Sequence, residues 1–325
     1  MEIMEEKRIS IYRPHTILRR LLLVDGVARC GKSLLCPILA SLKDVEIERM
    51  EVSYEYIAEL YYMRKIEHDA AVSLIRQFSD EFIYNSLLSR NINFRWQDHS
   101  SVFRNPNWMR YVRRLFAKEG PEIVKQINEN NPILQTQSHD QMGYVDLYFD
   151  AYPSEFQMIE IIRNPIDQID TWWRRGWGTR FGEDPYDMTL CLKVGNRAVP
   201  FYALGWEMEY LEMLPMDRIV RMLYELQMKN RVGYEKLPDS RKSKVYVVRF
   251  EDFVTKPFLH IDKIAAFLGT RITRYTKSAV KRQKCPRNLS LEERAKKYDV
   301  IKKECGGEYW KLVEKMIADY DVEWK

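Results

Sequence analysis

The fold of this chain is decided near its N-terminus, where residues 21–42 read LLLVDGVARCGKSLLCPILASL. The first four of these residues form an uninterrupted apolar run, which is typical of a strand buried on both faces of a parallel sheet. After Gly31, apolar residues recur at the spacing of a helix that continues to Ser41. A buried strand, a glycine-containing turn and a helix form the first half of a crossover unit, so a parallel sheet is predicted to begin here.

The turn itself matches the phosphate-loop pattern GxxxxGK[ST] at every fixed position. Glycines let the backbone turn tightly, so that successive N–H groups converge on phosphate oxygens, and the following helix adds the positive end of its dipole. The alternative is a strand-to-helix turn whose glycines only satisfy the geometry; the complete match between a strand and a helix favours a phosphate site. The predicted phosphate-binding residues are Gly26, Arg29, Cys30, Gly31, Lys32 and Ser33.

Three further apolar stretches predict strands, and helical patterns separate them. These stretches are residues 132–137, 156–162 and 245–250. Strands that alternate with helices indicate a parallel α/β protein. Residues 176–237 show helical patterning without a strand signal, and residues 285–325 are predicted to be a C-terminal helical tail. We therefore predict one domain over residues 1–325, an α/β, P-loop NTPase-like parallel sheet flanked by helices, with a helical insertion.

Polar residues follow two of the predicted strands, at the edge where parallel α/β proteins carry their chemistry. His139 is a candidate base, because histidine can accept a proton near neutral pH, although a lone histidine is more often structural. His99 is the competing base. Arg163 follows the next strand and, with the hydroxyl of Thr171, could hold a second phosphate. The alternative is that Arg163 pairs with Asp167 and caps a helix.

The composition excludes several classes of protein. The 52 Lys+Arg and 47 Asp+Glu leave a net charge of only +5 on 325 residues, which is too little for a nucleic-acid-coating surface. An anionic ligand is therefore expected to be small. The five cysteines are odd in number and scattered without metal-ligand spacing, which favours a reducing cytoplasm and no metal site. Neither a signal segment nor a membrane span is expected.

In their order along the chain, these motifs resemble sulfotransferases that use 3′-phosphoadenosine 5′-phosphosulfate (PAPS). The shared features are the phosphate loop, the histidine after a middle strand, and Arg-Asn-Pro-x-Asp-x-x-x-Thr over residues 163–171. Residues 248–254, with Pro257 and Phe-Leu-Gly at 267–269, are similar to that family's late strand and helix. The resemblance implies PAPS as sulfuryl donor, 3′-phosphoadenosine 5′-phosphate (PAP) as product, and a small-molecule or carbohydrate acceptor.

The resemblance also implies roles for single residues. His139 matches the catalytic base. Arg29 stands where cytosolic members usually have lysine, and it would offset charge in the transition state. The phosphate loop would hold the 5′-phosphosulfate, and Arg163 with Thr171 would hold the 3′-phosphate. Arg287 lies in a basic loop that would close over the nucleotide, or is a solvated turn. The departures from the family pattern are Lys32 for threonine, Gln137 for lysine, and Leu34 for the aromatic residue that contacts adenine.

Two aromatic and polar stretches are predicted to flank the acceptor. They are residues 91–101, in which Asp98 could bind an acceptor hydroxyl, and residues 172–177, where tryptophan beside arginine suits sugars or other polar rings. Ordinary helix packing is the alternative for both.

Two other functions remain open at the level of the sequence. The first is a Mg²⁺-dependent P-loop kinase or NTPase, in which Ser33 would ligate the metal and Asp25 or Glu160 would supply the acid. The second is a nucleotide-binding scaffold without catalysis, which the changed loop residues suggest. The sulfotransferase interpretation requires no metal, because cations of the protein already neutralise the leaving phosphate.

Overall fold

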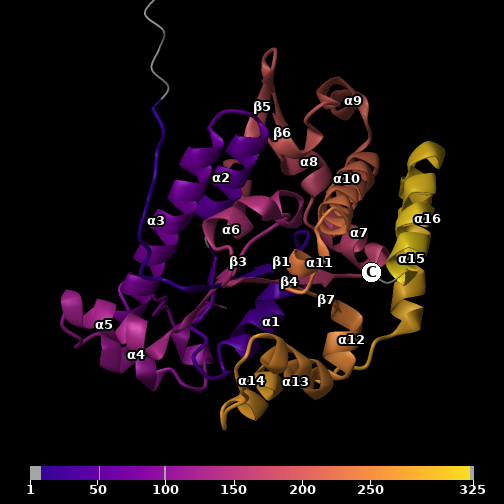
Figure 1. Ribbon diagram of the computed structural model, residues 1–325. Coiled ribbons are helices and arrows are strands. Elements are labelled where there is room, and N and C mark those ends of the chain that lie inside the picture. Colours follow the sequence, from indigo (N-terminus) through magenta and orange to yellow (C-terminus); the bar gives the residue numbers. More distant parts are fainter. Residues whose placement is uncertain (1–8, 51, 99, 323–325) are drawn as a thin grey trace, which may run out of the picture.

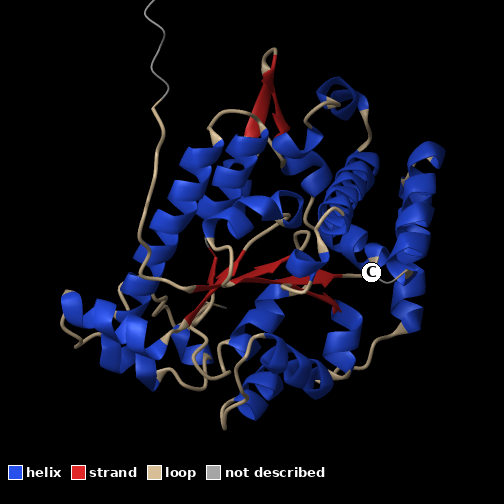
Figure 2. Cartoon of the chain, in the orientation of Figure 1, coloured by secondary structure: helices blue, strands red, loops and turns tan. Residues whose placement is uncertain are grey.

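The computed structural model describes residues 9–50, 52–98 and 100–322, and its centre is a five-stranded parallel sheet (Figures 1 and 2). The strands lie in the order β2-β3-β1-β4-β7. Their bounds are β1 Arg20–Asp25, β2 Arg49–Met50, β3 Ile133–Gln137, β4 Phe156–Ile162 and β7 Val245–Arg249. The four predicted strands and the α/β class are confirmed. The edge strand β2 is not predicted, since two residues carry no periodicity.

The central strand β1 separates two hydrophobic cores, because successive side chains of a strand point to opposite faces of the sheet. Leu21 and Leu23 pack in one core with residues of α3 and α6, whereas Leu22 and Val24 pack in the other with α1 and α13. Figure 1 shows the corresponding helix layers on the two sides of the sheet. All four side chains are at most 1% exposed, as the unbroken apolar run predicts.

The helices of these layers connect the strands. They are α1 Lys32–Leu39, α2 Val52–Tyr62, α3 His68–Leu87, α4 Met109–Arg114, α5 Pro121–Asn130, α6 Val145–Ala151, α7 Pro165–Arg174, α11 Asp239–Lys242, α12 Phe250–Thr255, α13 Pro257–Phe267 and α14 Thr276–Arg282. Short 3₁₀ helices are η1 Val102–Arg104, η2 Met142–Tyr144, η3 Pro185–Asp187 and η4 Phe201–Ala203.

The segment of residues 176–237 is helical only in part. It contains α8 Trp177–Arg180, α9 Glu207–Glu212 and the long α10 Pro215–Glu235, but also an antiparallel hairpin of β5 Cys191–Val194 and β6 Arg197–Pro200. The prediction of a segment without strands is therefore wrong. The two strands have four residues each and β5 is largely exposed, so no apolar run marks them in the sequence. Figure 2 shows the hairpin projecting from the helical layer.

The C-terminal tail consists of α15 Leu291–Glu304 and α16 Gly307–Asp321, with a break between them at Cys305 and Gly306. Both helices pack on α7, and α16 also packs on α10 (Figure 1). The backbone N–H of Gly306 donates to the Asp217 carboxylate at 2.8 Å, which fixes the break against α10. Within the described ranges, we find no helix of the length and apolarity that crossing a membrane requires.

Candidate active site

Three neighbouring strands, β3, β1 and β4, bring the predicted site residues to one edge of the sheet. Val24 of β1 lies in register with Gln137 of β3 and Ile159 of β4, and all three strands run parallel. Their carboxyl ends therefore carry the phosphate loop, the His139 loop and Arg163 side by side.

The phosphate loop depends on its two glycines. Gly26 and Gly31 have φ angles of +135° and +120°, which side chains disfavour. A side chain at Gly26 would clash with the carbonyl oxygen of Ile161, and one at Gly31 would clash with the ring of Phe250. Arg29 also has a positive φ, +72°, and its side chain is exposed at the mouth of the loop. The loop is thus held in a conformation that β4 and α12 impose.

The guanidinium groups of Arg163 and Arg175 lie close enough to Arg29 at this mouth to act on its charge. Partial burial lowers the pKa of Arg29, and the charges of Arg175 and Arg163 lower it further. The Arg163 guanidinium donates to the carbonyl oxygen of Arg29 at 2.7 Å and stacks over the ring of Phe250, 4.9 Å from its centroid. In the described part of the chain, none of the three arginines forms an ion pair with a carboxylate. Like charges held together without an acid favour a bound anion.

Lys32 does not extend outward. Its ammonium donates to the carbonyl oxygen of Gly26 and lies 3.5 Å from that of Val27, and the residue is only 3% exposed. Burial would lower the pKa of Lys32, but Cys30 and the carboxyl groups of Asp25, Asp140 and Glu160 outweigh that effect and raise it. Lys32 therefore stabilises the inside of the loop in this structure, and Arg29 is the loop cation that faces outward.

Asp25, at the end of β1, anchors the loop that carries His139. One carboxylate oxygen accepts from the hydroxyl of Ser138 at 3.0 Å, and the other accepts from the backbone N–H groups of Gln141 at 2.7 Å and Met142 at 3.1 Å. Asp25 is fully buried, so these bonds are shielded from water. Its role here is to fix the backbone around His139.

His139 pairs with Glu55 of α2. Its Nδ1 lies 2.8 Å from Oε1 of Glu55, and the two side chains are 20% and 12% exposed. The sequence analysis misses Glu55, because 84 residues separate the pair and the α2 pattern contains no motif. His99, the competing base, lies outside the described residues.

Buried charges surround this pair. Burial raises the pKa of Asp140 to about 6, and burial together with Glu55 raises the pKa of Glu59 to about 9. Lys229 of α10 donates to the hydroxyl of Tyr144 at 3.0 Å and lies 4.3 Å from its ring centroid. The insertion thus supplies a cation next to the His139 loop, whereas residue 137 is glutamine rather than the family's lysine.

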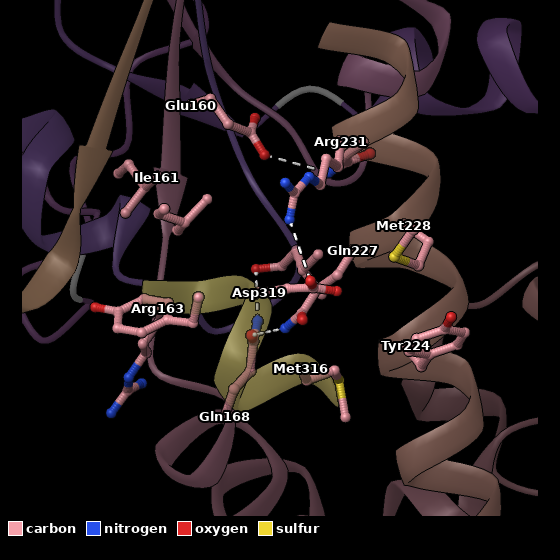
Figure 3. A pocket seen from close by; sticks show the side chains of 14 residues that line it. Glu160, Ile161, Arg163, Gln168, Tyr224, Gln227, Met228, Arg231, Met316 and Asp319 are labelled. Atoms are coloured by element: carbon pink, nitrogen blue, oxygen red, sulfur yellow. Dashed lines mark hydrogen bonds and ion pairs between the residues drawn. The ribbon is translucent and has the colours of Figure 1, made fainter. Parts of the chain in front are cut away.

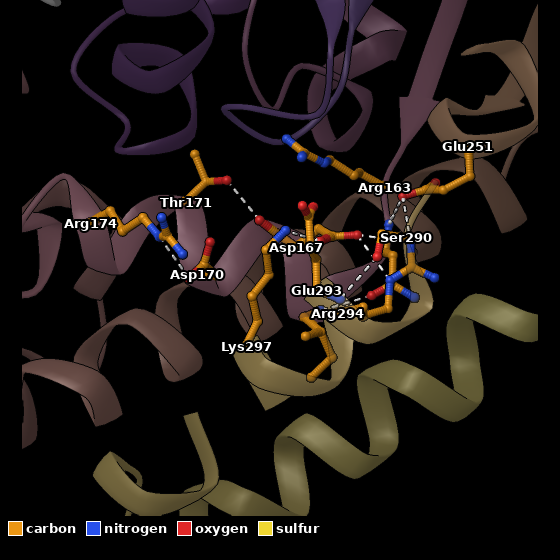
Figure 4. Close-up of polar contacts among 12 residues, drawn as sticks. Arg163, Asp167, Asp170, Thr171, Arg174, Glu251, Ser290, Glu293, Arg294 and Lys297 are labelled. Atoms are coloured by element: carbon orange, nitrogen blue, oxygen red, sulfur yellow. Dashed lines mark hydrogen bonds and ion pairs between the residues drawn. The ribbon is translucent and has the colours of Figure 1, made fainter. Parts of the chain in front are cut away.

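The second predicted phosphate contact lies at the start of α7 (Figure 4). Asp167 does not pair with Arg163; it accepts from Arg294 at 2.8 Å and from Lys297 at 2.6 Å, both on α15. Asn164 caps the helix instead, since its side chain accepts from the N–H of Ile166 at 3.1 Å. The alternative of an Arg163–Asp167 cap is therefore wrong.

The hydroxyl of Thr171 donates to the carbonyl oxygen of Asp167 at 2.7 Å, one turn back in α7 (Figure 4). This bond uses the hydroxyl hydrogen and leaves the oxygen as an acceptor. Holding a phosphate through Thr171 therefore requires the hydroxyl to rotate.

The contacts of Arg287 are with α12 and the end of α14, not with the phosphate loop. Its backbone N–H donates to the carbonyl oxygen of Val254 at 2.7 Å, and its guanidinium donates to that of Gln283 at 2.9 Å. Its Nε is buried without a partner among the described residues. These contacts join the loop after α14 to α12, which contributes to the same core as the phosphate loop's helix α1.

The predicted acceptor stretches are partly structural. Trp172 is fully buried and donates to the carbonyl oxygen of Ala28 at 3.0 Å, so it supports the phosphate loop from beneath. Packing is the correct interpretation for this residue. Asp98 accepts from the side chain of Asn93 at 3.0 Å, within the turn of residues 91–101.

Solved structures of sulfotransferases are similar to this chain to different degrees, and the first of those named here supports the architecture. The sulfotransferase domain from the curacin biosynthetic pathway matches with a TM-score of 0.50 and 11% identity, over 94% of this chain and 99% of that one. The sulfotransferase domain from the Synechococcus PCC 7002 olefin synthase has a TM-score of 0.46 and 11% identity, over 97% and 100%. Retinol dehydratase in complex with androsterone and inactive cofactor PAP has a TM-score of 0.35 and 14% identity, over 94% and 83%.

No family model matches the chain, and no curated protein sequence matches it. At such low identities, the likeness concerns the fold. The chain has the sulfotransferase fold, as its motifs predict.

Proposed function

We propose that the chain is a PAPS-dependent sulfotransferase that transfers a sulfuryl group to a hydroxyl or amine of a small-molecule or carbohydrate acceptor in a reducing cytoplasm. The observation that carries the proposal is the cluster of Arg29, Arg163 and Arg175 at the mouth of the phosphate loop, without a carboxylate partner among the described residues. Such a cluster suits a small ligand with several negative groups. The fold likeness supports the same conclusion.

The residues present fit this nucleotide. The phosphate loop and Arg29 are proposed to hold the 5′-phosphosulfate, and Arg163 with Thr171 the 3′-phosphate. Arg163 already presents its guanidinium at the mouth of the loop, where it bonds to Arg29. The full set of proposed nucleotide contacts is Gly26, Arg29, Cys30, Gly31, Lys32, Ser33, Arg163, Thr171 and Arg287.

His139 is the proposed base. Donation from its Nδ1–H to the Glu55 carboxylate would leave Nε2 unprotonated and would hold the ring in one orientation. As the acceptor oxygen or nitrogen bonds to sulfur, the bond from sulfur to the 5′-phosphate oxygen breaks and its electron pair leaves with PAP. The acceptor proton passes to Nε2. Arg29 offsets the negative charge on the sulfuryl and leaving oxygens.

The Mg²⁺-dependent kinase alternative fits the buried acids less well. Both carboxylate oxygens of Asp25 already accept hydrogen bonds. Burial and the nearby charge of Asp25 raise the pKa of Glu160 well above its usual range, which favours the neutral carboxyl group. Ser33 donates to Gln137 at 3.4 Å. Neither acid is therefore a free carboxylate that could hold a hydrated Mg²⁺.

A thermal-shift titration tests the nucleotide. PAP without metal should raise the melting temperature of the full chain, because a ligand that binds only the folded state stabilises it. ATP with Mg²⁺ should raise it less at equal concentration. Greater stabilisation by ATP with Mg²⁺ would contradict the proposal and favour the kinase.

The scaffold alternative is tested with His139→Ala and PAPS. The variant should bind PAP as the unchanged chain does and lose about 10²- to 10⁴-fold in the rate of PAP release from PAPS in the presence of an accepted substrate. Glu55→Gln, which keeps the hydrogen-bond geometry, should show a smaller loss and a shifted pH profile. Unchanged turnover in His139→Ala would remove this residue from its role.

A further inference from the structure

A pocket that the proposed reaction does not use lies between the end of β4 and helices α10 and α16 (Figure 3). About 560 Å³ of space lies between its walls, including the part that opens to solvent. Apolar groups of Ile161, Tyr224, Met228 and Met316 form most of the lining. Figure 3 shows Met228 and Tyr224 on α10 and Met316 on α16, at the pocket.

Two polar side chains line the deep part of the pocket. Glu160 of β4 and Asn230 of α10 are each 1% exposed, and the Asn230 amide donates to Oε1 of Glu160 at 3.2 Å. Oε2 of Glu160 and Oδ1 of Asn230 are buried and have no hydrogen-bond partner in the described part of the chain. A buried polar atom without a partner costs about 1–3 kcal/mol, so two such atoms in one pocket point to a ligand that satisfies them.

The two orphan atoms have complementary roles. Burial and the charge of Asp25 raise the pKa of Glu160 well above the usual range, which favours its neutral, protonated form. Its carboxyl group is therefore an O–H donor, while Oδ1 of Asn230 can only accept. At one side of the pocket, Arg231 pairs with Asp319 at 3.4 Å and with Glu235 at 2.9 Å, so the charge of Arg231 is neutralised within the protein. The pocket thus offers one donor and one acceptor in largely apolar surroundings.

We propose that this pocket binds a neutral, planar ring that carries an adjacent N–H and C=O, as in a lactam or the pairing edge of a nucleobase. The ring N–H would donate to Oδ1 of Asn230, and the carbonyl oxygen would accept from Glu160. The flexible thioethers of Met228 and Met316 would pack on the ring faces.

The pocket is separate from the proposed nucleotide site but shares a wall with it. Val27 and Arg163 line the pocket, and Gln168, which also lines it, donates to the carbonyl oxygen of Ala28 at 3.0 Å. Occupation of the pocket does not depend on the sulfotransferase function, so failure of one proposal leaves the other standing.

An NMR titration of the full chain with ¹³C-methyl-labelled methionine tests the proposal. The probes are 2-pyridone, which has the N–H and C=O edge, and N-methyl-2-pyridone, which lacks the donor. With 2-pyridone, the methyl signals of Met228 and Met316 should shift saturably, and N-methyl-2-pyridone should bind about tenfold more weakly or worse. The signal of Met208, which is 67% exposed on α9, should not move.

Two results would overturn the proposal: no saturable shift of either pocket methionine, or equal affinity for the two probes. Asn230→Leu, which removes the acceptor, should lower the affinity for 2-pyridone about tenfold and leave the affinity for N-methyl-2-pyridone unchanged. Because Asn230→Leu also leaves Glu160 without its partner, Met228→Trp serves as a second variant that fills the pocket. It should abolish the shift at Met316, and circular dichroism of the same sample confirms that the protein is folded.

Discussion

Two clusters of cations lie near α7, and they differ in whether a carboxylate neutralises their charge. In one cluster, Arg294 and Lys297 both bind the carboxylate of Asp167; we call this cluster the Asp167 lock. The arginine mouth, formed by Arg29, Arg163 and Arg175, has a backbone carbonyl and aromatic rings as its partners among the described residues. The charge of Asp167 is neutralised in the lock, which ties the C-terminal tail to α7. The positive charge of the mouth has no carboxylate partner in the described part of the chain, and this is why we propose the mouth, and not the lock, as a binding site.

The largest difference between variants of the arginine mouth and of the Asp167 lock is expected in the rate of sulfuryl transfer. Arg29→Ala should lower kcat about 10²- to 10³-fold, because it removes a positioned cation from the charge that develops in the transition state. Arg294→Ala, which removes one cation from the Asp167 lock, is the matched control and should change kcat less than about threefold. Steady-state rates with PAPS and one accepted substrate measure both. Equal losses in the two variants would show that the mouth and the lock do not differ in function.

A smaller effect is expected on affinity for the 3′-phosphate. Arg163→Ala should lower the affinity for PAP about 10- to 100-fold, because a charge-assisted contact is lost. It should barely change the affinity for adenosine 5′-phosphosulfate, which lacks the 3′-phosphate. Calorimetric titration of both ligands checks this.

Arg174→Ala is a suitable control for the 3′-phosphate prediction, because Arg174 is 70% exposed and pairs with Asp170 on the same helix. Similar losses for the two nucleotides in Arg163→Ala would contradict the assignment of Arg163 to the 3′-phosphate.

The arginine mouth shows which parts of the candidate site the sequence can predict. Arg29 and Arg163 stand in local motifs, and the parallel order of β1 and β4 brings those motifs together, so their meeting is predictable from strand and turn patterns. The direction of Lys32 is not predictable in this way. Its side chain turns inward because the carbonyl oxygens of the loop accept its protons in this conformation.

The Asp167 lock and the Glu55–His139 pair show where sequence reasoning fails. Arg294 lies 127 residues after Asp167, in a tail that contains no motif. Glu55 lies on an amphipathic helix. The apolar pattern of such a helix predicts which residues are buried, but it does not predict which residue a polar side chain contacts. Long-range contacts of this kind depend on how the helices pack against the sheet, and that packing becomes visible only in three dimensions.

A substitution in the Asp167 lock is expected to have the smallest effect, and it should change only the stability of the protein. Burial opposes ionisation of Asp167, but hydrogen bonds from Lys297 and Arg294 outweigh it and lower the pKa of the carboxyl group. A depressed folded-state pKa stabilises the protein above the unfolded pKa of about 3.9, and this stabilisation is lost as the pH falls through the folded-state value. Asp167→Asn should therefore lower the melting temperature by about 3 °C or more near pH 7.

The difference between Asp167→Asn and the unchanged chain should shrink as the pH falls below about 4, because the Asp167 carboxyl group then takes up a proton in the unfolded state first and, at lower pH, in the folded state. Asp170→Asn is the control on the same helix, since its partner Arg174 is exposed and such pairs contribute at most about 1 kcal/mol. Melting curves from pH 3 to pH 8 measure the three proteins. A melting-temperature difference for Asp167→Asn that does not change with pH would show that the Asp167 lock acts through shape and packing rather than through charge.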